Sequence, residues 1–140
     1  ERRGAPVTAY VRIDSKPIRL RSQIYSPDYA IIQDASLLND GRILADLKRG
    51  ASVIINTSKK ASELSLPKNL KIKTINASGL ALEIIGKPII NTILLGAFAG
   101  STGLIQLSGA EKAIKERFSA EIAEKNIAAL RRGFEVINQN

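Results

Sequence analysis

Three short apolar runs, each ending in a polar residue, are the feature that most restricts how this chain can fold. They are Tyr29 to Gln33, Ala51 to Asn56 and Leu70 to Asn76. The first two are almost continuously apolar, which is typical of strands buried on both faces of a sheet. The third alternates between polar and apolar residues and predicts a strand nearer a sheet edge. We therefore expect the core to form around a largely buried sheet.

The segments between these runs predict the connections of a parallel sheet. Asp34 can cap a helix over Leu37 to Lys48, although the Asp40-Gly41 pair weakens the middle of that helix. The polar stretch from Ser58 to Leu66 predicts a short helix or a loop. This alternation of strands and crossovers is the pattern of βαβ units. We therefore expect an α/β fold, a three-layer α/β/α sandwich with a mainly parallel sheet.

The part of the chain after the third run predicts two further helices. Ser78 can cap a helix from Gly79 to Ile85, and the uncharged stretch from Pro88 to Ala110 contains a second. Polar residues and glycines within that stretch disfavour a membrane span and favour a buried helix from about Asn91 to Ala99. Glycines spaced four residues apart allow a helix to approach another backbone closely, here predicted to be the sheet. These glycines are Gly96 and Gly100.

The C-terminal part of the sequence predicts a pair of helices. A capping-box pattern at Ser108 begins a helix that ends near Ser119, and apolar residues spaced by four and three from Ala123 to Ile137 form the docking face of a final helix. No composition change marks a second domain, so we expect a single domain over residues 1–140. Helical spacing also predicts two surface ion pairs, Glu111–Lys115 and Glu121–Lys125.

Small polar side chains occur where each predicted strand ends. Asp34 follows the first run directly, and Asn56 and Asn76 are the last residues of the second and third runs. In parallel sheets the carboxyl ends of the strands form the ligand-facing edge, so these side chains could line a crevice. Asp and Asn are also common helix caps and turn residues. The sequence leaves both interpretations open.

The N-terminal stretch, ERRGAPVTAYVRIDSKPIRLR, predicts a basic β-hairpin. Apolar residues alternate with polar ones from Val7 to Ile13 and again from Ile18, and the Asp14–Pro17 segment interrupts them with turn chemistry. Arginines suit bidentate contact with phosphate or carboxylate groups, so the hairpin favours a phosphate-bearing ligand or the acidic surface of another subunit. The arginines concerned are Arg2, Arg3, Arg12, Arg19 and Arg21.

The composition excludes most kinds of independent catalysis. The 140 residues include no Cys and no His, which rules out Cys-His and Ser-His nucleophiles, the usual zinc sites and cysteine-ligated iron–sulfur clusters in this chain. The net charge of +8 suggests an acidic partner, but only 4% of residues are aromatic, too few for base stacking on nucleic acid. Neither a G-x-G-x-x-G nor a Walker lysine motif is present. We predict no catalytic residue and no metal ligand.

Several segments together resemble a known family. They are ERRGAPV, KPIRLRSQIYSPDYAIIQD, VIINT, ALEIIGKPIINTILLGAFAGSTGLI and IAEKNIAALRRGFE, and they run in order along nearly the whole chain. This combination resembles the gamma subunit of 2-oxoacid:ferredoxin oxidoreductases, and the ERRGAPV form is more similar to the pyruvate type, pyruvate synthase, than to the 2-oxoglutarate type.

The resemblance implies a noncatalytic role in a cytoplasmic, multisubunit enzyme. Such complexes convert pyruvate and coenzyme A to acetyl-CoA and carbon dioxide while reducing ferredoxin. Thiamine diphosphate with Mg is held by the alpha and beta subunits, and iron–sulfur clusters by delta and beta. The gamma subunit packs beside the thiamine site and is associated with coenzyme A. On this basis Asn56 and the five arginines are expected to contact coenzyme A or another subunit.

The sequence also departs from the family pattern at its start. The family opens with a glycine-rich G-x-G-G-Q-G strand, turn and helix before the ERRG segment, whereas this sequence begins at ERRG. We expect that a first strand and helix precede it or are supplied as a separate piece. Asn76 and Ser78 stand where the family often has Asp and Thr. The alternative to a gamma subunit is a standalone basic domain that binds nucleotide or nucleic acid, with salt-sensitive affinity.

Overall fold

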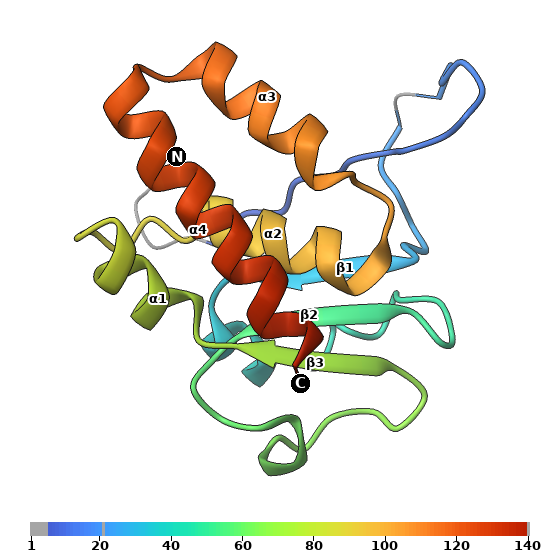
Figure 1. Ribbon diagram of the computed structural model, residues 1–140. Coiled ribbons are helices and arrows are strands. Elements are labelled where there is room, and N and C mark those ends of the chain that lie inside the picture. The colour runs from blue at the N-terminus through green and yellow to red at the C-terminus, as the bar shows by residue number, and fades with distance from the viewer. Residues whose placement is uncertain (1–5, 21, 140) are drawn as a thin grey trace.

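A sheet of three parallel strands lies at the centre of the computed structural model, which describes residues 6–20 and 22–139 (Figure 1). The strands follow each other in chain order across the sheet, and Ile31 of the first aligns with Ile54 of the second. The predicted α/β class with a parallel sheet is confirmed. The strands are β1 (Tyr29–Ile32), β2 (Ser52–Asn56) and β3 (Lys71–Ile75).

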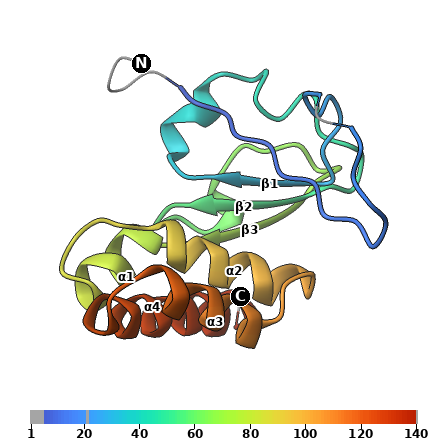
Figure 2. The same cartoon turned by 90° about the horizontal axis from the view of Figure 1, so that it is seen from above.

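Helices cover one face of the sheet (Figure 2). α2 and α4 cross closely, α1 packs beside them, and α3 lies against α4 on the side away from the strands. Ile54 of β2 and Ile93 of α2 are fully buried in the core between the layers. The final helix is buried along the predicted face from Ala123 to Ile137. The helices are α1 (Ala77–Ile84), α2 (Asn91–Thr102), α3 (Leu107–Arg117) and α4 (Ala120–Asn138).

The opposite face is covered by a thinner layer of leucine-rich turns. Its ordered pieces are the short 3-10 helices η1 (Ala35–Asn39) and η2 (Ala61–Glu63). The predicted helix over residues 37–48 is wrong. The Asp40 side chain accepts a hydrogen bond from the Arg42 backbone N–H, at 3.1 Å, and the chain continues as turns instead of α-helix. Leu44 and Leu47 still pack on the sheet, so the apolar pattern correctly predicted which side chains face the core.

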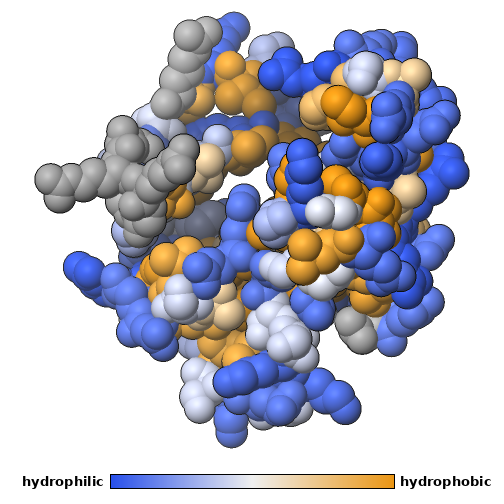
Figure 3. All heavy atoms as spheres, turned by 90° about the vertical axis from the view of Figure 1, so that its left-hand side faces the viewer, coloured by the Kyte–Doolittle hydropathy of each residue, from blue (hydrophilic) through white to orange (hydrophobic). Residues whose placement is uncertain are grey.

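The N-terminal segment does not form the predicted β-hairpin within its described residues. The turn occurs as expected, because Asp14 accepts a hydrogen bond from the Lys16 backbone N–H at 3.0 Å, but no strand is present on either side of it. Side chains join the two legs instead: Gln23 donates to the Tyr10 hydroxyl at 3.0 Å. The apolar side chains of the legs have no covering layer, as Val11 shows with 77% exposure. Figure 3 shows hydrophobic side chains at the surface around a gap in the upper part of the molecule.

Three predicted helix boundaries shift for local reasons. α1 is capped by Asn76, whose side chain accepts from the Gly79 N–H at 2.9 Å, and not by Ser78. α2 continues past Gly100 and ends at Gly103, which has the left-handed φ of 68° that favours glycine. The predicted capping box at Ser108 does not form, because Gln106 is the N-cap of α3.

No helix in the described part of the chain is long and apolar enough to cross a membrane.

The glycines of α2 pack against α4 and not against the sheet as predicted. A Cβ atom on Gly96 would overlap the carbonyl oxygen of Leu130, and one on Gly133 would overlap the carbonyl oxygen of Ile93. The two helix backbones are therefore in direct contact at this crossing. The buried Thr92 hydroxyl donates to the Asn126 side chain at 2.6 Å beside it.

Glu111 forms an ion pair that differs from the predicted one with Lys115. Its carboxylate accepts from Arg131 at 2.6 Å and ties α3 to α4, while the predicted Glu121–Lys125 pair is present at 3.4 Å. The side-chain hydrogen bond from Arg131 lowers the pKa of Glu111 from its ordinary 4.5. A lowered folded-state pKa means that this pair stabilises the fold above the unfolded-state pKa and is lost as the pH falls through the folded-state pKa.

We expect Glu111→Gln to reduce the free energy of unfolding at neutral pH. The variant's free energy of unfolding should also depend less on pH in the acid range than that of the wild type. The difference from wild type should shrink as the pH falls below 4.5, because Glu111 then becomes protonated in the wild type as well. Urea unfolding at neutral pH and at about pH 3.5 measures this difference. Glu116→Gln is the matched control, since the exposed Lys112–Glu116 pair spans 3.9 Å and should contribute little. Equal differences at both pH values for Glu111→Gln would contradict the assignment.

Candidate functional site

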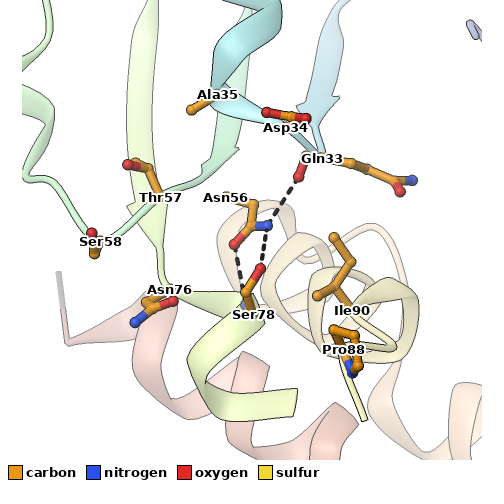
Figure 4. A pocket seen from close by; sticks show the side chains of 10 residues that line it. All are labelled: Gln33, Asp34, Ala35, Asn56, Thr57, Ser58, Asn76, Ser78, Pro88 and Ile90. Atoms are coloured by element: carbon orange, nitrogen blue, oxygen red, sulfur yellow. Dashed lines mark hydrogen bonds between the residues drawn. The ribbon is translucent and has the colours of Figure 1, made fainter. Parts of the chain in front are cut away.

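A polar crevice lies at the edge of the sheet where the strands end (Figure 4). Its volume is about 480 Å³. Side chains from the ends of all three strands, from the start of α1 and from the loop before α2 meet there. This is the edge at which open α/β sheets bind ligands. The lining residues are Gln33, Asp34, Ala35, Asn56, Thr57, Ser58, Asn76, Ser78, Pro88 and Ile90.

Asn56 occupies the middle of the crevice and joins three elements. Its side-chain N–H donates to the Gln33 carbonyl at 2.9 Å and to the Ser78 hydroxyl at 3.0 Å, and its oxygen accepts from the Ser78 backbone N–H at 3.3 Å (Figure 4). The amide therefore links the end of β1 to the start of α1. Because its hydrogen-bonding groups already have partners, Asn56 shapes the crevice more than it offers groups to a ligand. The Ser78 hydroxyl keeps its own proton to donate.

The other two strand-end residues act as caps. Asp34 accepts from the Ser36 backbone N–H at 2.9 Å, and Asn76 caps α1. Backbone and side-chain hydrogen bonds from Ser36 lower the pKa of Asp34, so its carboxylate is charged at neutral pH. The capping interpretation is thus confirmed for both residues. Asp34 and Asn76 also line the crevice. Capping and crevice lining, the two interpretations left open by the sequence, therefore both apply to these residues.

Three lysines are next to lining residues of the crevice in the chain, and the sequence-based prediction of the site did not include them. Lys59 and Lys60 follow the lining residue Ser58, and Lys87 precedes the lining residue Pro88. All three are exposed, and none forms an ion pair with a residue in the described ranges. The signal was available in the sequence, because Thr57-Ser58-Lys59-Lys60 directly continues a predicted strand. Polar lining beside free cations suits an anionic ligand with hydroxyl or amide groups.

Of the predicted arginines, Arg12 and Arg19 lie in the described part of the chain, and Arg12 lies apart from Asn56. Arg12 donates to the carbonyls of Ser22, at 2.9 Å, and Gln23, at 3.3 Å, on the loop that leads into β1. This loop is at the end of the sheet where strands begin, opposite the crevice (Figure 1). Arg19 is exposed on the same segment. Arg2, Arg3 and Arg21 lie outside the described residues.

A second hollow of about 400 Å³ lies within the N-terminal segment, lined partly by Tyr10, Arg12 and Ile18. Arg12 uses its guanidinium there to hold the two legs together, so its observed role is positional. Neither hollow contains His or Cys, because the sequence has none. Within the described residues, no group of three potential metal ligands is present. The groups that line the two hollows are suited to binding and positioning.

Comparison with known proteins agrees with the resemblance seen in the sequence. The family model described as pyruvate ferredoxin/flavodoxin oxidoreductase matches residues 1–136. The pyruvate/ketoisovalerate oxidoreductases common subunit gamma of Thermococcus litoralis is 48% identical over 96% of this chain and 75% of that protein. Pyruvate synthase subunit PorC of Methanocaldococcus jannaschii is 48% identical over 92% of this chain and 70% of its own length.

A solved structure shares both the fold and the sequence pattern. The pyruvate oxidoreductase subunit PORC of Thermotoga maritima superposes with a TM-score of 0.74 at 32% identity, over 80% of this chain. The chain spans 64% of the length of that structure. With the family model covering nearly all residues, this chain belongs to the pyruvate ferredoxin/flavodoxin oxidoreductase family and is one of its gamma-type subunits.

Proposed function

We propose that this chain is the noncatalytic gamma subunit of an oxidoreductase that acts on pyruvate or a related 2-oxoacid with ferredoxin as acceptor. In this role it supports thiamine-dependent oxidative decarboxylation to acyl-CoA, while thiamine diphosphate, Mg and the iron–sulfur clusters belong to alpha, beta and delta subunits. Its own contribution is to bind coenzyme A and to help assemble the complex. The absence of Cys and His from the sequence fits a subunit without a cluster or a nucleophile.

The carboxyl-edge crevice is the observation that carries the coenzyme A part of this proposal. Coenzyme A combines phosphate groups with an adenosine and a chain that has apolar and amide parts. Lys59, Lys60 and Lys87 supply exposed positive charge for the phosphates. The Ser78 hydroxyl and the Asp34 carboxylate offer a donor and an acceptor to the sugar and base. Ile90 offers apolar contact at the rim.

The N-terminal segment supports the assembly part of the proposal. It carries exposed apolar side chains between Val7 and Leu20 together with the cations Lys16 and Arg19, and no strand or helix covers them within the described residues. Apolar area with charge at its margin is typical of protein interfaces. Contact of the predicted arginines with coenzyme A or with another subunit remains part of this proposal.

Coenzyme A binding to the assembled complex tests the crevice. We expect changing Lys59, Lys60 and Lys87 together to Ala to weaken coenzyme A binding at least about tenfold, because each lost charge contact contributes on the order of a kcal/mol. Titration calorimetry on the purified heteromer gives the dissociation constant. The matched control changes Lys68 and Lys71 to Ala, since these lysines lie where β3 begins, at the opposite end of the sheet.

The outcomes separate the two parts of the proposal. Equal weakening by both sets of lysine changes would show a general charge effect and overturn the crevice as the coenzyme A site. Arg19→Ala should leave coenzyme A affinity unchanged and reduce the yield of assembled complex if the N-terminal segment contacts another subunit. A chain that remains monomeric when alpha, beta and delta subunits are coexpressed would overturn the assignment as a gamma subunit.

A further inference from the structure

Three loops meet at the end of the sheet where the strands begin, opposite the crevice (Figure 1). We call them the amino-end loops, residues 26–28, 48–51 and 67–71. Their backbones are hydrogen-bonded to one another: the Lys48 N–H donates to the Pro27 carbonyl at 3.2 Å, and the Gly50 N–H donates to the Asn69 carbonyl at 2.8 Å. The three loops therefore form one continuous surface.

The amino-end loops carry more positive charge than they neutralise. They contain four cations and one acid, Asp28. Lys48 contacts that acid at 2.6 Å, so the negative charge already has a partner. The remaining cations, Arg49, Lys68 and Lys71, are exposed, and none of them forms an ion pair with a residue in the described ranges. Three positive charges thus stay available on two adjoining loops.

The helical layer arranges its charges differently. Four cations of α3 and α4 each contact a glutamate, at distances between 2.6 and 3.9 Å; they are Lys112, Lys125, Arg131 and Arg132. Unpartnered positive charge is therefore not a general property of the surface. The amino-end loops also adjoin an exposed aromatic residue, since Tyr25 comes directly before the first loop and is 75% exposed. Tyr and Arg are both enriched in protein interfaces.

We propose that the amino-end loops dock on an acidic face of another subunit of the oxidoreductase complex. Charge complementarity carries this inference. The Arg49 guanidinium suits a bidentate contact with a carboxylate, and Lys68 and Lys71 act as point charges beside it. The Tyr25 ring adds apolar contact. A protein partner fits better than nucleic acid, because a single aromatic residue adjoins these loops and base stacking needs several.

Docking at this end has a consequence for the crevice. The amino-end loops and the crevice lie at opposite ends of the strands, so a subunit held at the loops leaves the carboxyl edge of the sheet open. The inference rests on the proposed function as a gamma subunit, but it does not depend on where coenzyme A binds.

Salt-dependent dissociation of the assembled complex tests the surface. The probe is the heteromer of this chain with coexpressed alpha, beta and delta subunits, diluted and weighed by mass photometry. We expect Arg49→Ala, Lys68→Ala and Lys71→Ala together to raise the dissociation constant of this chain at least about tenfold at about 50 mM salt. At about 500 mM salt the difference from wild type should largely disappear, because salt screens exposed charges.

The matched control removes the same amount of charge from the helical layer. Lys112→Ala, Lys115→Ala and Arg117→Ala change three exposed cations of α3, which lies on the side of α4 away from the strands (Figure 2). This variant should dissociate like wild type at both salt concentrations. The amino-end variant, once assembled at low salt, should bind coenzyme A as tightly as wild type, which shows that its fold is intact.

Several results would overturn the inference. They are equal weakening by both triple variants, a loss that salt does not reduce, and a heteromer of unchanged stability. Slower ferredoxin reduction by an equally stable variant would assign the loops to the acceptor protein, and nucleic acid that copurifies with wild type alone would assign them to nucleic acid. A wild-type chain that never enters the heteromer would overturn the proposed function as well, so the two failures are distinguishable.

Discussion

Replacing Gly96 by Ala should destabilise the protein by at least about 3 kcal/mol, because the added methyl group has no room. Its Cβ would overlap the Leu130 carbonyl oxygen and lie 2.8 Å from the Leu130 carbonyl carbon. Both atoms belong to the α4 backbone, which cannot move aside as a flexible side chain could. Relief requires α2 and α4 to separate, which opens the core around Ile93 and Leu94. Urea unfolding of the purified chain measures the loss.

Two matched glycine variants show whether backbone contact is the cause. Gly133→Ala should be comparably destabilising, because its Cβ would overlap the Ile93 carbonyl oxygen from the other side of the crossing. Gly109→Ala lies in α3 with nothing within 4 Å of its added Cβ, so it should be neutral or stabilising by up to about 1 kcal/mol through helix propensity. If Gly96→Ala changed stability by less than about 1 kcal/mol, the close helix crossing would be wrong.

The strands were predictable because their signals are local. β2 and β3 both lie within the predicted runs. A buried parallel strand such as β2 requires an uninterrupted run of apolar residues, whereas an edge strand such as β3 tolerates alternating polar and apolar residues. The same pattern overestimated the burial of β1, which was expected to be buried on both faces. Burial depends on what lies beside a strand in space. The sequence of β1 itself does not contain that information.

The N-terminal segment and the residues after η1 show a second limit. Alternating residues from Val7 to Ile13 are compatible with a strand, but a hairpin forms only where a neighbouring surface buries its apolar side. Near Asp40, the apolar spacing of a helix was present, but the Arg42 backbone N–H donates a short-range hydrogen bond to the Asp40 carboxylate and the chain forms turns instead. Local pattern therefore identified which residues face the core, while tertiary contacts determined the backbone conformation.

The candidate site was predictable in outline and not in its charges. The βαβ pattern brought Asp34, Asn56 and Asn76 to one edge, as the structure shows. The arginine prediction differs from the structure at Arg12, which contacts the loop that leads into β1 and not the crevice. The lysines next to the crevice lie in two separate loops, because Lys59 follows the lining residue Ser58 after β2, and Lys87 precedes the lining residue Pro88 between α1 and α2.

Asn56→Asp should lower stability by about 2 kcal/mol at neutral pH and recover part of it in acid. The side-chain N–H of Asn56 donates to the Gln33 carbonyl and to Ser78. A carboxylate cannot donate, and it would place negative charge against the Gln33 oxygen. That repulsion raises the folded-state pKa of the new carboxyl group above its unfolded-state value. The deficit relative to wild type should therefore shrink as the pH falls through the raised pKa, between about pH 7 and 4.

Asn76→Asp is the matched control, because it makes the same chemical change where only an acceptor is needed. The Asn76 side-chain oxygen accepts from the Gly79 N–H at the start of α1, and a carboxylate keeps that role while interacting favourably with the helix N-terminus. Asn76→Asp should therefore be neutral or stabilising at neutral pH, whereas Asn56→Ala should show a deficit without acid recovery. Urea unfolding at several pH values distinguishes these cases. Equal behaviour of the two Asn→Asp variants would mean that Asn56 does not hold the crevice together by donating from its amide.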